Sequence, residues 1–218
     1  SLTCSGISSE VEHEIIISDD ASTDGTTAIV QEYAHQYPDI IKPVIETENQ
    51  WQKGGLRHII SIMNEKHRRG KYIAFCEGDD YWIHPNKLQI QIDFLDKHPE
   101  VVVSCHRCNL REERDGGSKI YLRPYDEDMS RFGEDGTFLL DFEEFFVKGY
   151  WIAEYHATVL RNIYDPYYWK NCKYTRDVHM MFYLLKHGLG VCHSFIGGVY
   201  RRNMGGVFSS LQQVQIAE

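Results

Sequence analysis

The chain has 218 residues, of which 42% are hydrophobic and 25% are charged, an ordinary composition for a folded protein with one sizeable core. Its formal net charge of −9 argues against general nucleic-acid binding, because such binding depends on Lys and Arg neutralising phosphates. No apolar stretch of the sequence is long enough to cross a bilayer, and six cysteines do not make a dense disulfide framework. These properties predict a cytoplasmic, reduced protein.

The first half of the chain alternates between short apolar runs and segments with helical spacing. Strands are expected at residues 14–18, 40–46, 72–76 and 101–105, and helices at residues 22–36, 56–69 and 87–97. Ser22 or Thr23 is expected to cap the first helix, and Gly70 follows the second, where a glycine commonly ends a helix. The alternation predicts an α/β fold with a doubly wound, mostly parallel sheet and helices on both of its faces.

The second half loses this rhythm. Residues 109–136 are rich in charge and read as loop material with a short strand at 119–122. Helices are then expected at residues 141–148 and 175–187, strands at residues 157–161 and 190–196, and a Gly/Arg loop from residue 200. Because no internal repeat divides the chain, one domain is expected over residues 1–218.

An acidic turn, Glu77-Gly78-Asp79-Asp80, directly follows the apolar run at residues 72–76. Hard divalent cations such as Mn²⁺ and Mg²⁺ prefer carboxylate and phosphate oxygens, and often take only one or two ligands from the protein. Carboxylates on either side of Gly78 can point toward one ion, while the glycine lets a phosphate or ribose approach closely. The strand context favours a site for a metal-bound nucleotide over the alternative, a solvated acidic turn.

A second acidic cluster, formed by Asp19, Asp20 and Asp24, follows the strand signal at residues 14–18. A carboxylate at a strand end can accept a hydrogen bond from a nucleotide base or a ribose hydroxyl. The alternative is that these residues cap the following helix, a common role for Asp and Ser. Both roles stay open for Asp19 and Asp24, whereas a nucleotide contact is favoured for Asp20.

Two further groups lie in the second half. Asp177 opens the helix expected at residues 175–187, where an aspartate usually acts as a cap or as a partner of the helix dipole. Arg201 and Arg202 belong to a basic, glycine-rich segment that suits a diphosphate, because arginine binds phosphate through two parallel hydrogen bonds. A plain surface loop is the alternative for this segment.

These motifs together resemble those of a known family. The run Glu-Ile-Ile-Ile-Ser-Asp-Asp-Ala-Ser-Thr-Asp-Gly-Thr from Glu14, the run Glu-Gly-Asp-Asp-Tyr-Trp-Ile-His-Pro-Asn-Lys-Leu from Glu77, and Arg-Asp ahead of a helix resemble a family 2 glycosyltransferase of the GT-A fold. The resemblance extends from about residue 14 to about residue 210. It implies the inverting transfer of a sugar from a UDP-, GDP- or dTDP-sugar, with Mn²⁺ or Mg²⁺ as cofactor.

The resemblance also assigns roles to individual residues. Asp20 corresponds to the aspartate that contacts the nucleotide base, with Asp19 and Asp24 beside it. Glu77-Gly78-Asp79 stands in the place of the family's Asp-x-Asp motif, which makes Asp79 the metal ligand and puts Glu77, Gly78 and Asp80 beside the donor. Asp177 stands in the place of the catalytic base, and Arg201 and Arg202 in the segment that closes over donor and acceptor.

A single GT-A domain is therefore expected, with residues 1–108 binding the nucleotide sugar and residues 109–218 binding the acceptor and carrying the catalytic base. One departure is the absence from residues 1–13 of the strand that normally opens this fold, so the chain is either a fragment or a shortened variant. Two alternatives to an active transferase follow: a truncated, inactive nucleotide-binding domain, and a nucleotidyltransferase acting on sugar phosphates.

The family's acceptors include saccharides and lipid-linked sugars. The resemblance therefore implies a role in bacterial polysaccharide or glycoconjugate synthesis, with peripheral contact at the inner face of the membrane and no nucleic-acid partner.

Overall fold

The computed structural model describes residues 12–50, 53, 69–114, 117–122, 128–147, 154–163, 165, 168 and 177–202. These residues belong to two compact units, each with its own internal contacts. One unit contains the described residues of 72–161 and 182–202, and the other contains those of 12–71 and 162–181. The expected helix at residues 56–69 lies almost entirely outside the described residues.

Among its described residues, the smaller unit contains a parallel strand pair, the helix between the two strands, and residues 177–181 of a later helix. Strand β1 (Ile15–Asp19) pairs with β2 (Ile41–Ile45), and helix α1 (Thr26–Gln36) connects them. Among the described residues no side chain caps α1, which begins after Gly25 with a φ of 94°, a conformation that favours glycine. The expected cap at Ser22 or Thr23 is therefore wrong, and the turn preceding α1 is held by aspartates instead.

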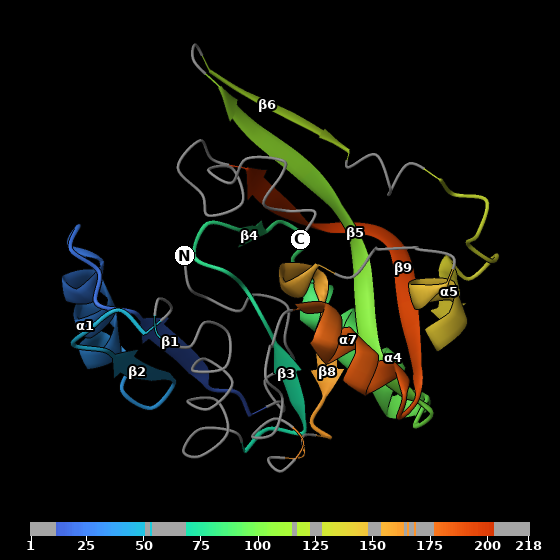
Figure 1. The fold of residues 1–218 in the computed structure, drawn as a ribbon, viewed down its shortest axis with the longest axis horizontal. Helices are drawn as coiled ribbons and strands as arrows, with labels where there is room; N and C mark the ends of the chain where they lie inside the picture. The colour runs from blue at the N-terminus through green and yellow to red at the C-terminus, as the bar shows by residue number, and fades with distance from the viewer. Residues whose placement is uncertain are drawn as a thin grey trace. The chain divides into compact units, whose positions relative to one another are not determined.

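The larger unit is built on a seven-stranded sheet, ordered β3-β8-β5-β9-β4, with β6 beside β5 and β7 beside β9 (Figure 1). The strands are β3 (Tyr72–Ala74), β4 (Tyr81–Trp82), β5 (Val101–Arg114), β6 (Gly117–Leu122), β7 (Thr137–Leu140), β8 (Val159–Arg161) and β9 (Leu189–Arg202). Only β5 and β9 pair in parallel in this sheet. The expected mostly parallel sheet is thus corrected to a mixed sheet with largely antiparallel pairing.

The correction has a physical reason in the charged segment that was expected to be a loop. Residues 109–114 continue β5, turn back into the antiparallel β6, and lie beside the basic end of β9 on the other side. Glu112 pairs in register with Arg202 of β9 and lies 3.4 Å from it, and Arg201 reaches Glu113 of β5 at 2.8 Å. Opposite charges on neighbouring strands stabilise a polar strand that a local hydrophobic pattern cannot reveal.

Helix α4 (Lys87–Lys97) covers the core of the larger unit and has the bounds that the sequence predicts. Leu95 of α4 joins Val101, Val159 and Val191 in a buried cluster of three strands and one helix. The other helices are α5 (Phe142–Phe146), the 3₁₀ helix η2 (Tyr155–Ala157) and α7 (Asp177–Leu185). No helix in the described ranges has the length and apolar character needed to cross a membrane.

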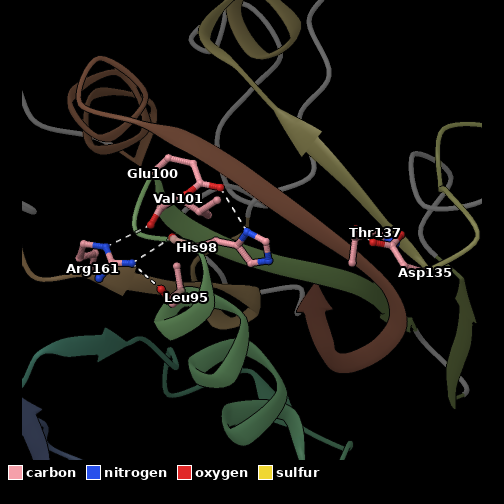
Figure 2. A network of polar contacts seen from close by, with 7 residues as sticks. All are labelled: Leu95, His98, Glu100, Val101, Asp135, Thr137 and Arg161. Atoms are coloured by element: carbon pink, nitrogen blue, oxygen red, sulfur yellow. Dashed lines mark hydrogen bonds and ion pairs between the residues drawn. The ribbon is translucent and has the colours of Figure 1, made fainter.

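Arg161, at the end of β8, fastens the carboxyl end of α4 to the sheet (Figure 2). Its Nη2 atom donates to the carbonyl oxygens of Leu95 at 2.6 Å and His98 at 3.2 Å, and its Nε donates to that of Val101 at 3.1 Å. The last carbonyls of a helix have no partner within the helix, so one guanidinium here supplies donors for the end of α4 and the start of β5.

We expect Arg161→Met to lower the free energy of unfolding by roughly 2–4 kcal/mol, because three carbonyls lose hydrogen bonds from a charged donor. Arg69→Met is the matched control, since Arg69 is 77% exposed and its ion pair with Glu14 is a surface pair. Urea denaturation of both variants gives the comparison. Equal losses would contradict the anchoring role of Arg161.

Candidate functional site

The site in the larger unit lies where the acidic turn meets the end of β9. Strands β3 and β5 are both antiparallel to β8, and β5 is parallel to β9, so β3, β5 and β9 run in the same direction. The turn at residues 77–80 leads from β3 to β4, which pairs with β9 on the far side of the strand order. The main-chain N–H of Arg201 donates to Oδ1 of Asp80 at 2.8 Å, which joins the turn to β9 directly.

Asp80 is the centre of this junction. Its main-chain N–H donates to the carbonyl of Glu77 at 3.1 Å and closes the turn. Its Oδ2 atom is 2.9 Å from Nδ1 of His156, with side-chain exposures of 1% and 0%, although the two atoms lack the alignment of a hydrogen bond. The sequence gives no sign of this role for His156, because a single histidine has no spacing signal that links it to a turn far away in the chain.

The carboxyl group of Glu77 lies in a strongly acidic environment. Burial of the carboxyl, followed by the charges of Asp80, Glu154 and Asp79, raises the pKa of Glu77 to about 8. The residue as a whole keeps exposed surface, as do Gly78 and Asp79. A cation beside Glu77 would offset the negative charges that raise its pKa, so the turn suits the divalent ion that the sequence predicts.

Two arrangements of metal ligands are compatible with these positions. The ligand atoms of Glu77, Asp80 and His156 lie within 4.8 Å of one another. However, an ion that also binds a diphosphate must be reachable by the donor, and the side chains of Asp80 and His156 are almost completely buried. Asp79 is exposed, and a Cβ added at the neighbouring Gly78 would meet no described atom within 4 Å, so this end of the turn has room for a ligand.

Arg201 and Arg202 end β9 rather than belonging to a loop, and their guanidinium groups face acidic residues of β5. Nη2 of Arg201 is 2.8 Å from Oε1 of Glu113, and Nη1 of Arg202 is 3.4 Å from Oε1 of Glu112. The hydrogen bond to Glu113 is the main cause that raises the pKa of Arg201, and Asp79 is one of the nearby charges that add to it. The glycine-rich residues after Arg202 lie outside the described part of the chain.

A buried lysine that the sequence did not reveal lies against β4. Lys87 begins α4, and its Nζ lies 4.3 Å from the ring centroid of Trp82 in β4. This Nζ has no hydrogen-bond partner among the described residues, and burial lowers the pKa of Lys87 to about 7. The indole N–H of Trp82 in turn donates to the carbonyl of His156 at 2.7 Å, and this hydrogen bond connects β4 to η2.

The first acidic cluster lies in the smaller unit, where two of its members hold the start of α1. Asp19 accepts hydrogen bonds from the main chain of Ser22 and the hydroxyl of Thr27, and the side-chain bonds with these two residues lower its pKa. Asp24 accepts from the hydroxyl of Thr26 at 2.6 Å and from its N–H at 3.1 Å, which lowers its pKa. Both aspartates therefore have a structural role, and a nucleotide contact for either stays a prediction.

Asp20 and Asp177 complete the predicted residues. Asp20 Oδ1 accepts the main-chain N–H of Gln50 at 2.6 Å, which connects the end of β1 to the segment after β2. Asp177 lies in α7, within the helix expected at residues 175–187, whose first two residues are outside the described part of the chain, and its side chain is not among the described ones.

Comparison with known proteins finds relatives that match part of this chain. An uncharacterized protein of Mycobacterium tuberculosis is 44% identical over 93 residues, which are 43% of this chain and 25% of the relative. The UDP-Glc:alpha-D-GlcNAc-diphosphoundecaprenol beta-1,3-glucosyltransferase WfaP of Escherichia coli is 36% identical over 85 residues, 38% of this chain and 30% of that protein. The dTDP-rhamnosyl transferase RfbG of Shigella flexneri is 34% identical over 86 residues, 39% of this chain and 29% of its own length.

These alignments thus cover less than a third of each relative, so the resemblance concerns one segment of longer proteins. A match to the family model described as glycosyl transferase family 2 extends further, over residues 8–163, and includes both acidic clusters. Because this match covers more than half of the sequence, the chain belongs to glycosyl transferase family 2.

Proposed function

We propose that this family 2 glycosyltransferase moves a sugar from a nucleotide-sugar donor to an acceptor hydroxyl with inversion, assisted by Mn²⁺ or Mg²⁺. The observation that carries the proposal is the 2.8 Å hydrogen bond from the N–H of Arg201 to Asp80, because it fixes an arginine beside the acidic turn. Carboxylates suited to a hard cation and a guanidinium suited to phosphate then serve the same diphosphate.

The acidic turn would bind the donor through three neighbouring residues. Asp79 would hold the metal, Glu77 would lie nearer the ribose, and Gly78 would leave room for the phosphates. The open space at Gly78 and the exposure of Asp79 support this division of roles. When bound, the divalent ion would offset the negative charge that develops on the departing diphosphate.

The remaining roles follow the family pattern. Asp177 would take the proton from the acceptor hydroxyl as its oxygen attacks the anomeric carbon in a single displacement. Arg201 and Arg202 would contact the diphosphate after exchanging part of their pairing with Glu113 and Glu112. Asp20, with Asp19 and Asp24, would contact the nucleotide.

The names of the relatives suggest the substrates. WfaP is named for UDP-Glc and RfbG for dTDP-rhamnose, and a further relative in Bacillus subtilis is named as a minor teichoic acid biosynthesis protein. We therefore propose a UDP-, GDP- or dTDP-sugar as donor and a saccharide or lipid-linked acceptor, in bacterial polysaccharide or glycoconjugate synthesis at the inner face of the membrane. Residues 1–218 would act as one GT-A domain.

The test is sugar transfer to saccharide and lipid-linked acceptors with UDP-glucose, GDP-mannose and dTDP-rhamnose, each with Mn²⁺, with Mg²⁺ and with EDTA. We expect metal-dependent release of one nucleoside diphosphate per sugar transferred. Gly78→Val should raise the donor KM by roughly tenfold or more, since about 1.4 kcal/mol of lost binding is a tenfold change. It should leave the melting temperature nearly unchanged, because a Cβ added at Gly78 meets no described atom within 4 Å.

Transfer that persists in EDTA would contradict the metal-assisted mechanism. Nucleotide binding without turnover by any donor would favour the inactive nucleotide-binding domain instead.

A further inference from the structure

We infer that Asp80 and His156 form a positioning pair that fixes the spacing between Asp79, the proposed metal ligand, and Arg201, the proposed diphosphate contact. The inference rests on the proposed function and deepens it, because it assigns a task to two buried residues that would not touch the donor. His156 in particular comes from η2, a part of the fold that neither acidic cluster includes.

The pair is built as a buried junction between three segments. One carboxylate oxygen of Asp80 accepts the N–H of Arg201 at 2.8 Å, and the other lies 2.9 Å from Nδ1 of His156. Both side chains are within 1% of complete burial. A buried carboxylate is costly unless it is paired, so the hydrogen bond from Arg201 and the adjacent imidazole favour the observed arrangement of the turn, η2 and the end of β9.

The imidazole of His156 is itself held from several sides. The indole of Trp82 donates to its carbonyl at 2.7 Å. A Cβ added at Gly198 would lie 2.8 Å from the His156 ring, so a glycine is required there for β9 to pass so closely. The ring of Tyr200 stacks on the imidazole with an angle of 11° between planes and 6.2 Å between centroids. The histidine therefore has one position, and through Asp80 it gives one position to the turn.

The geometry explains how the exposed Asp79 and the partly exposed Arg201 could act on the same diphosphate. Asp79 precedes Asp80 in the turn, and the Arg201 main chain is bound by the same Asp80 carboxylate. A shift of this carboxylate would move Asp79 and Arg201 apart or rotate one against the other. Residues behind metal ligands that orient them in this way typically change metal affinity by about 10–100-fold when substituted.

The experiment compares wild type with His156→Leu, His156→Asn and Asp80→Asn. Leucine removes the nitrogen that faces Asp80, asparagine keeps an amide nitrogen near the position of Nδ1, and Asp80→Asn removes the charge while keeping an acceptor for Arg201. The matched control is His106→Asn. His106 is also fully buried, and its ring centroid lies 6.5 Å from that of His156, but its Nδ1 is hydrogen-bonded to the carbonyl of Arg107 and does not face Asp80.

Dissociation constants are measured for UDP, GDP and dTDP with Mn²⁺, together with melting temperatures and the donor KM and kcat. We expect His156→Leu and Asp80→Asn to raise the dissociation constant and the donor KM by roughly tenfold or more. His156→Asn should recover part of the loss. His106→Asn should lower the melting temperature while leaving nucleotide affinity within about twofold, since it removes a structural contact only.

The outcomes separate the pair from the proposed function. If His156→Leu and His106→Asn both lose stability and neither changes nucleotide affinity, the pair is merely structural and the inference is wrong. If wild type binds none of the three nucleotides with Mn²⁺, the proposed donor site itself is wrong, and the inference is lost with it. Should His156→Leu not fold, the polar His156→Asn and the isosteric Asp80→Asn decide the question.

Discussion

Asp177→Asn is expected to lower kcat by roughly 10²–10⁴-fold while leaving donor affinity nearly unchanged, the range that removal of a general base usually produces. The amide has the size of the carboxylate but cannot accept the proton that the acceptor hydroxyl releases on attack. Asp177 is the first described residue of α7, so the helix positions its backbone. Initial rates at saturating donor and acceptor, with equilibrium binding of the nucleotide, give the two quantities.

A helix-start aspartate can also act through stability, and the control must remove that explanation. Asp141 caps α5 in the structure, with its carboxylate accepting the N–H of Glu144 at 2.7 Å. Asp141→Asn should cost a fraction of a helix cap, up to about 1 kcal/mol, without a comparable loss of kcat. If Asp177→Asn loses stability to a similar degree and keeps its kcat, Asp177 is a cap, and the base must be sought elsewhere.

Local signals in the sequence were sufficient where a residue's neighbours along the chain determine its structure. Helix α4 has its predicted bounds because Lys87, Gln91 and Leu95 repeat at helical spacing and form its buried face. The acidic turn was identified in the same way, since an apolar strand followed directly by carboxylates is a contiguous pattern.

Partners distant in the chain explain what the sequence did not predict. Residues 111–114 have the composition of a loop, yet they extend β5 because Arg201 and Arg202 lie beside Glu113 and Glu112. The role of His156 could not be predicted from the sequence either, because it depends on Asp80. Only the folded structure brings Nδ1 of His156 within 2.9 Å of Oδ2 of Asp80. Alternating strands and helices also predicted parallel pairing, whereas the direction of each pair depends on connections that the local pattern does not contain.

The aspartates of the two acidic clusters also differ in whether their partners are near or distant in the sequence. Asp19 and Asp24 have hydrogen-bond partners at most eight positions away, so their contacts hold the turn that precedes α1, although neither caps the helix. Asp80, by contrast, is bound by β9 and lies against η2. A carboxylate whose partners are distant in sequence organises a site, whereas one with local partners organises a turn.

Asp79→Asn is expected to weaken the stabilisation that a nucleotide with Mn²⁺ provides, without lowering the stability of the free protein. In wild type, a nucleotide with Mn²⁺ at a hundredfold excess over its dissociation constant should raise the free energy of unfolding by about 2.7 kcal/mol. The variant should lose most of this gain because the amide is a poor ligand for a hard cation. Without metal, the variant should be as stable as wild type or more so, since Asp79 is one of the charges that raise the pKa of Glu77.

A general loss of stability could not produce this result, because the variant should lose the response to nucleotide and Mn²⁺ while the free protein stays as stable as wild type or becomes more stable. Asp128→Asn is the matched control, because Asp128 is an exposed aspartate whose carboxylate accepts hydrogen bonds from Ser130 in a turn of its own. It should show the reverse pattern, with a small loss of stability in the free protein and a full response to nucleotide and Mn²⁺. If Asp79→Asn keeps the metal response, the ion must be held without Asp79. The ligand atoms of Glu77, Asp80 and His156, within 4.8 Å of one another, would then be its binding site.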